Sequence, residues 1–154
     1  MKKYQFQARV INKPAKNLKQ LFKDKKESKK HNNCKVCQHL RRQFTCEDRF
    51  LVYQFNCKYC SKFYIGETSR PFNFRFKEHE RCIKQTNLAC ALAEHAIMAH
   101  NSDLSIDDFD LDIIRKCKSP VETRLAEARA IGTLRPQLNR KHEIGCFSSL
   151  PFTL

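Results

Sequence analysis

The chain has 154 residues, of which 30 are lysine or arginine and 16 are aspartate or glutamate, so its formal net charge is +14. This length suits one ordinary domain with a tail. With 41% hydrophobic and 30% charged residues, the composition excludes a wholly disordered chain and a membrane protein. Three glycines in the whole chain leave no glycine-rich loop of the nucleotide-binding kind. No apolar run approaches the roughly 20 residues of a spanning helix, and the start lacks a secretory signal, so we expect an intracellular chain without membrane contact.

Residues 1–30 form a strongly basic segment. It holds eleven lysine or arginine residues and two acidic ones, a net charge of +9, which leaves only +5 for the other 124 residues. Such an arm typically binds polyanions by neutralising phosphates and releasing counterions. A solvated tail without a partner is an equally good interpretation. The lysine clusters at 23–30 also fit a nuclear localisation signal, a motif with many false matches.

Hydrophobic patterning and helix-terminus signals predict six elements. In chain order these are strands at 50–55 and 63–65, helices at 71–83 and 88–99, a strand at 109–114 and a helix at 121–134. Ser119 and Pro120 supply an N-cap and a first-turn proline for the last helix, in which we expect Leu125, Ala128 and Ile131 to face the core. The order predicts an α+β fold, a small three-stranded antiparallel sheet covered by helices.

Cysteine and histidine spacing predicts a zinc site. Nine cysteines without an export signal favour metal binding over disulfides. Cys57-x2-Cys60 and His95-x4-His100 together supply two thiolates and two imidazoles, a donor set that suits tetrahedral Zn2+. We expect a structural ion that clamps the connection between the first two strands to the second helix. The alternative is an unrelated pair of histidines on that helix.

A second cysteine cluster lies upstream. Cys34-x2-Cys37 and Cys46, with His39 or His31 as the fourth donor, could form another zinc site or could be free cysteines in a linker. The remaining cysteines show no pairing pattern, and we expect them to be small buried or half-buried residues: Cys82, Cys90, Cys117 and Cys146.

Two tyrosines on neighbouring strands and an arginine on the next helix can converge on a phosphate. Tyr53 stands in Leu51-Val52-Tyr53, Tyr64 begins Tyr64-Ile65-Gly66, and Arg75 follows on the predicted helix. This order resembles the GIY-YIG nuclease family. The YIG element is intact, and the GIY element keeps only its tyrosine.

Three later residues extend this resemblance in the family's order. His79 follows Arg75 by one helical turn, Glu127 lies in the last predicted helix, and Asn139 comes after Pro136. Each also has a simpler interpretation as a surface or strand residue; Glu127, for example, could pair with a neighbouring arginine on its own helix. Their joint order favours one site.

A narrower resemblance involves the cysteines and histidines. Cys57 and Cys60 between the two tyrosine motifs, with the stretch 91–95 ending at His100, resemble the endonuclease domain of Penelope-like retroelements. The resemblance covers about residues 14–142, including the linker before that domain. With the composition of the chain, it predicts a basic arm at 1–30, a Cys/His-rich linker at 31–48, a nuclease domain at 49–142 and a tail at 143–154. It also implies a reverse transcriptase as a partner in cis or in trans.

The family's chemistry implies a metal-dependent endonuclease that nicks DNA. Tyr53 or Tyr64 would act as general base, and Arg75 would lower the pKa of that phenol while holding the scissile phosphate. His79 would reach the same phosphate. Glu127 would bind Mg2+ or Mn2+.

Asn139 would position the catalytic ion or the backbone. Two alternatives to an active nuclease remain open. One is a catalytically inactive, zinc-stabilised module that binds nucleic acid, and the other is a zinc-stabilised interaction domain without a nucleic-acid role.

Overall fold

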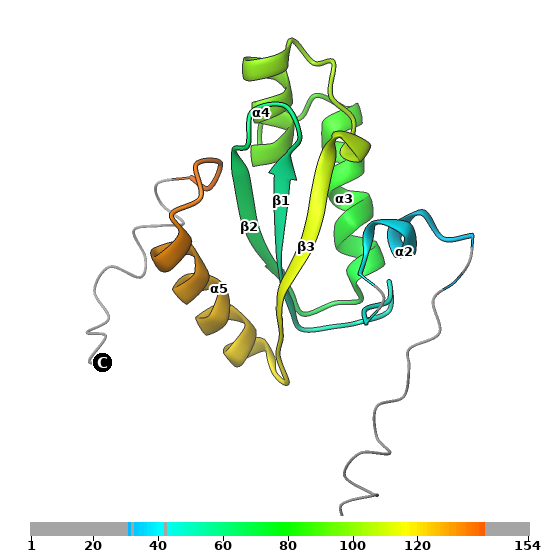
Figure 1. The fold of residues 1–154 in the computed structure, drawn as a ribbon, viewed down its shortest axis with the longest axis vertical. Coiled ribbons are helices and arrows are strands. Elements are labelled where there is room, and N and C mark those ends of the chain that lie inside the picture. The colour runs from blue at the N-terminus through cyan, green and yellow to red at the C-terminus, as the bar shows by residue number, and fades with distance from the viewer. Residues whose placement is uncertain (1–30, 32, 42, 141–154) are drawn as a thin grey trace, which may run out of the picture.

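A computed structural model describes residues 31, 33–41 and 43–140 (Figure 1). The basic arm, the lysine clusters at 23–30, Cys146 and the expected tail at 143–154 lie outside the described residues. The elements are α2 (Lys35–His39), β1 (Leu51–Cys57), β2 (Phe63–Thr68), α3 (Phe72–Lys84), α4 (Ala91–His100), the 3-10 turn η1 (Ile106–Asp108), β3 (Phe109–Lys116) and α5 (Pro120–Leu134). No helix in the described ranges is long and apolar enough to cross a membrane.

The predicted α+β fold with a small antiparallel sheet is confirmed. The strand order is β2-β1-β3, and both pairings of the central strand β1 are antiparallel. In this register Tyr53 lies opposite Gly66 on one side and Ile113 on the other. The first tyrosine therefore occupies the middle of the sheet, and Tyr64 lies two residues before Gly66 on the neighbouring strand.

Helices cover both faces of the sheet. Leu51, Tyr53 and Phe55 alternate along β1 and join the main core, in which α3 and α4 also bury residues. Val52 points to the other face because side chains alternate along a strand, and there it packs with Ile65 against the last helix. Figure 1 shows the sheet lying between α3 and α5.

The last helix begins and ends as its sequence signals predict. Ser119 Oγ accepts a hydrogen bond from the Glu122 backbone N–H at 3.2 Å, and Pro120 occupies the first turn. The core face was predicted only in part. Ala128 and Ile131 are buried, whereas Leu125 is 55% exposed. Leu125 was a wrong core prediction because it lies on the side of the helix opposite the face that meets the sheet.

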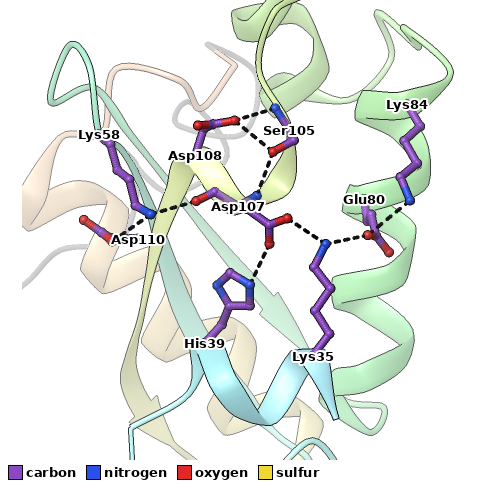
Figure 2. Close-up of polar contacts among 9 residues, drawn as sticks. All are labelled: Lys35, His39, Lys58, Glu80, Lys84, Ser105, Asp107, Asp108 and Asp110. Carbon is purple, nitrogen blue, oxygen red and sulfur yellow. Dashed lines mark hydrogen bonds and ion pairs between the residues drawn. The ribbon is translucent and has the colours of Figure 1, made fainter. Parts of the chain in front are cut away.

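The Cys/His-rich segment 31–48 packs against the sheet and α3. Val36 and Leu40 belong to the same buried cluster as Phe76. Polar contacts reinforce this docking at the outer surface (Figure 2). Lys35 Nζ lies 2.9 Å from Glu80 Oε1 on α3 and 2.9 Å from Asp107 Oδ2 on η1. The segment expected as a linker thus contributes to the core that contains the sheet.

Candidate functional site

Four donor atoms converge where the β1–β2 hairpin meets α4. Cys57 Sγ lies 3.6 Å from His100 Nε2, and Cys60 Sγ lies 3.4 Å from His95 Nε2. All four donor atoms lie within 4.8 Å of one another. A tetrahedral zinc ion with ordinary Zn–S and Zn–N bonds would separate sulfur from nitrogen by about 3.6 Å. This predicted cluster can therefore hold a metal ion such as zinc.

The hairpin backbone directs the two thiols toward α4. Cys57 ends β1 and its N–H donates to the Lys62 carbonyl at 2.9 Å, while Ser61 adopts a left-handed conformation with φ of 58°. The chain therefore turns sharply, and both cysteines face the same helix. Burial, followed by the charge of His100, lowers the pKa of His95. This shift favours the neutral imidazole that binds metal.

In the second cluster, His31 is the histidine that lies beside the thiols. His31 Nδ1 lies 3.3 Å from Cys46 Sγ, and the donor atoms of His31, Cys37 and Cys46 lie within 4.8 Å of one another. The pKa of Cys34 is lowered, first by a backbone hydrogen bond at Cys37 and further by hydrogen bonds with the Cys46 and Cys37 thiols. His31, Cys37 and Cys46 thus form a second group that can hold a metal ion, and the predicted ligand Cys34 is not among its converging donor atoms.

His39, the other histidine that the sequence offers as a fourth donor, lies apart from this group. Its Nε2 lies 2.9 Å from Asp107 Oδ1, as Figure 2 shows. Its ring also contacts Phe76. Residues two apart on a helix point to different sides. His39 therefore points away from Cys37, and His31, which precedes the helix, comes close to the thiols instead.

The predicted tyrosine, arginine and histidine form one contact chain. Arg75 Nε donates to Tyr53 Oη at 2.8 Å, and Tyr53 Oη lies 2.9 Å from His79 Nε2. The Tyr64 ring approaches His79 with a centroid separation of 5.7 Å. Helix α3 supplies Arg75 and His79 one turn apart, so both side chains reach across to the middle of the sheet.

Burial sets the protonation states of the contacting side chains Tyr53 and His79. Burial, followed by the charge of Arg75, lowers the pKa of His79 to about 3, so the imidazole is neutral at pH 7. Burial, followed by the charge of Tyr64, raises the pKa of Tyr53 well above its usual value. Tyr53 is thus protonated. Every N–H or O–H in the series has an acceptor if Arg75 donates to Tyr53 and Tyr53 donates to His79 Nε2. The Nδ1–H of His79 then donates to the Cys90 sulfur, 3.6 Å away.

The expectation that Arg75 lowers the pKa of its tyrosine partner does not hold for Tyr53. The guanidinium does oppose the shift, but desolvation of the phenolate is larger because Tyr53 is 0% exposed. Tyr64 is 7% exposed and borders a cavity. Of the two tyrosines, Tyr64 is therefore the one in a position to meet a ligand.

The third residue of the intact YIG element makes room for these rings. A Cβ atom at Gly66 would lie 2.6 Å from Tyr53 Oη and 2.8 Å from a ring carbon of Tyr64. Both separations are too short for real contacts. Glycine at this position thus permits the Tyr53 phenol to cross β2 and reach Arg75.

A cavity of about 210 Å³ lies beside the contact chain. Tyr64, Arg75 and His79 form part of its wall, and Glu78 holds Arg75 in place through a bond of 3.2 Å from Arg75 Nη1. Arg140 contributes a second guanidinium. The cavity wall therefore combines a phenol and two arginines with the one carboxylate of Glu78, and this excess of positive charge suits an anionic ligand such as a phosphodiester.

Asn139 acts on the backbone of the second strand. Its Oδ1 accepts from the Ile65 N–H at 2.9 Å and its Nδ2 donates to the Ile65 carbonyl at 2.8 Å. The Leu138 N–H also donates to the Phe63 carbonyl at 3.2 Å. The segment after α5 thereby covers the free edge of β2, and it delivers Arg140 to the cavity.

Glu127 reaches the site from α5 and lies outside the cavity wall that the described residues form. It is half-buried, and its charge contributes to the raised pKa of Tyr53. The carboxylate thus lies within electrostatic range of the buried phenol. Glu127 raises the pKa of Tyr53, whereas the charge of Arg75 lowers it.

Sequence patterns missed several residues of the cavity wall: Glu78, Cys82, Cys90 and Arg140. Glu78 is the only one with a local signal, because it follows Arg75 at a spacing that allows a helical ion pair. The others arrive through the α3–α4 connection and the segment after α5. Their positions depend on the tertiary fold.

Comparisons with known proteins give no relative for this chain. No protein-family model matches it, and no curated protein or solved structure matches at the required significance.

Proposed function

We propose that the chain is a GIY-YIG-type endonuclease that hydrolyses one strand of DNA at a time with the help of a divalent ion. The observation that carries this proposal is the contact chain of Arg75, Tyr53 and His79 beside a cavity that Tyr64 borders. Phosphodiester hydrolysis needs a base for the attacking water and donors for the charge that develops on phosphate oxygens. The cavity offers both kinds of group.

Each side chain has a distinct task in this proposal. Tyr64 is the general base, since it meets the cavity, and Tyr53 is a positioning residue that holds the Arg75 guanidinium. Arg75 donates through Nε to Tyr53 and through Nη1 to Glu78, and its Nη2 group is the donor that we propose for the phosphate. Arg140 extends the cationic surface along the bound strand.

Glu127 is the carboxylate that we propose for Mg2+ or Mn2+. Its half-buried position near Tyr53 fits a group that offers one hard oxygen ligand. Such an ion stabilises negative charge on reacting oxygens when it is bound. The Cys/His clusters are proposed to hold structural Zn2+, which fixes the hairpin and the segment 31–48.

The competing function is a zinc-stabilised nucleic-acid-binding module without catalysis. Two observations favour it: the full burial of Tyr53, and the position of Glu127 outside the cavity wall. Both proposals predict DNA binding that weakens steeply as salt rises. Only the first predicts cleavage.

Relaxation of a supercoiled plasmid separates the two. We expect the zinc-loaded chain to convert supercoiled DNA to open circles when Mg2+ is added, and not when Mg2+ is omitted. Mg2+ should be omitted rather than chelated, because a chelator would also remove zinc. DNA retention at about 50 mM salt is measured in parallel. Retention without nicking in Mg2+ or Mn2+ would favour the binding module, and loss of both would reject a nucleic-acid role.

A further inference from the structure

Two cysteines outside both metal clusters lie together on the wall of the cavity. Cys82 is on α3, one turn after His79, and Cys90 immediately precedes α4. Both are half-buried and pack against the main core. Their sequence positions show no pairing pattern, so the structure alone brings them together.

The two cysteines lie near each other on the cavity wall. Burial, followed by the Cys90 thiol, raises the pKa of the Cys82 thiol, and the Cys90 sulfur lies 3.6 Å from Nδ1 of His79, which is one turn before Cys82 on α3. The connection between them is fixed through Asn87, whose N–H donates to the Cys82 carbonyl at 3.0 Å and whose carbonyl accepts from the Cys90 N–H at 3.0 Å. These two bonds close the loop and hold Cys82 and Cys90 on the wall of the same cavity.

We infer that Cys82 and Cys90 form an oxidisable pair, and that their disulfide changes the adjoining cavity by releasing His79 from the Cys90 sulfur. The oxidant is a hydroperoxide. One thiolate attacks the peroxide, the O–O bond breaks, and a sulfenic acid and water result; the second thiol then displaces water from the sulfenic sulfur as the S–S bond forms. Two thiols and one hydrogen peroxide thus give one disulfide and two waters, and a dithiol reverses the reaction.

The geometry indicates the order of the two steps and their effect. Burial raises the pKa of the Cys82 thiol, so the first attack is assigned to Cys90, whose sulfur lies 3.6 Å from His79 Nδ1. Disulfide formation turns this sulfur toward Cys82 and weakens it as a hydrogen-bond acceptor. His79 then loses the partner that fixes its orientation toward Tyr53.

Peptide mapping tests the pair independently of any catalytic role. Trypsin cuts after Arg81 and Lys84, which leaves Cys82 on a tripeptide, and the next basic residue is Arg115, so Cys90 is the only cysteine of peptide 85–115. The reduced, zinc-loaded full chain is treated with a few equivalents of hydrogen peroxide and alkylated before digestion. We expect the tripeptide linked to peptide 85–115, and we expect dithiothreitol to release it.

Matched variants decide the result. Cys90→Ser should abolish the linked product, and Cys117→Ser, which removes a buried cysteine elsewhere, should retain it. Recovery of Cys82 and Cys90 as separately alkylated or over-oxidised peptides would overturn the inference.

A second readout concerns the cavity and rests on the proposed nuclease function. Peroxide should lower the nicking rate at least about tenfold, and dithiothreitol should restore it. Cys82→Ser should keep its own untreated rate under the same treatment. If the peptides are linked but the nicking rate is unchanged, the disulfide forms without altering the cavity, and that part of the inference would be wrong. Linked peptides from a protein that does not nick in its reduced form would overturn the nuclease alone.

Discussion

Loss of zinc from the Cys57–Cys60–His95–His100 cluster is expected to unfold the chain. Structural zinc in small domains contributes about 10–16 kcal/mol of apparent binding free energy, whereas a whole domain is stable by only about 5–15 kcal/mol. The ion would join the hairpin to α4 at one edge of the core. Without it, four polar donors would face one another in a partly buried space.

Cys60→Ser provides the sharpest version of this test. The Cys60 side chain is exposed, so its replacement removes no core packing and any large effect must pass through the metal. We expect one zinc ion fewer per chain than in the parent, and a melting transition that is lost or lowered by more than about 10 °C. Zinc content and circular dichroism measure the two effects.

Lys62→Ala is the matched control for Cys60→Ser, since Lys62 is exposed on the same hairpin. It should keep the zinc content and the melting temperature of the parent. A Cys60→Ser protein with parental zinc and parental melting temperature would show that the cluster holds no structural ion.

Substitution of Arg75 is expected to give the largest loss of nicking. Arg75 contacts Tyr53 and borders the cavity, and it supplies the guanidinium that we propose for binding the phosphate. Removing a preorganised donor from a charge-stabilising site commonly costs about 100- to 1000-fold in rate. We expect at least about a 100-fold loss for Arg75→Ala in single-turnover plasmid nicking, with DNA retention unchanged within a few-fold.

Arg75→Lys distinguishes geometry from charge. A lysine keeps the positive charge, but one ammonium group cannot donate to Tyr53 and also grip a phosphate with two parallel bonds. We therefore expect a large loss here too. Arg81→Ala, which changes an exposed arginine on the same helix, should nick at the parental rate. Parental rates for both Arg75 variants would remove Arg75 from the site.

The order of elements could be predicted because local signals dominate it. The aromatic and β-branched residues of β1, the alternation in β3, and Ser119 with Pro120 before α5 are signals that depend on neighbours within a few residues. The error at Leu125 has the same origin. A helix with small apolar residues on several sides does not specify which of them meets the sheet.

The candidate site was predictable only where spacing along the chain encodes it. Cys57-x2-Cys60 and His95-x4-His100 specify two halves of one cluster, and Arg75 and His79 lie one turn apart. Which of His31 and His39 lies beside the second cluster depends instead on how the short helix α2 docks on Asp107. Long-range packing likewise decides the burial of Tyr53.

The contact between Cys82 and Cys90 shows the same limit. Their spacing resembles no known ligand or disulfide pattern, and a loop whose backbone closes through Asn87 brings them together. The same holds for Arg140, which the hydrogen bonds of Asn139 to β2 carry to the cavity. Tertiary contacts of this kind leave no periodic trace in the sequence.

The most direct test of a metal-dependent site formed by Tyr64, Arg75 and Glu127 is the Mg2+ dependence of plasmid nicking by Glu127→Gln beside the parent. Glutamine keeps the shape of the side chain and removes the charged oxygen that would hold the ion. Glu122→Gln, which removes the other carboxylate of α5, serves as the control. We predict nicking by the parent and by Glu122→Gln, and a loss of at least about 100-fold in Glu127→Gln at every Mg2+ concentration. Equal nicking by all three proteins would contradict the assignment of Glu127 and the metal-dependent site built around it.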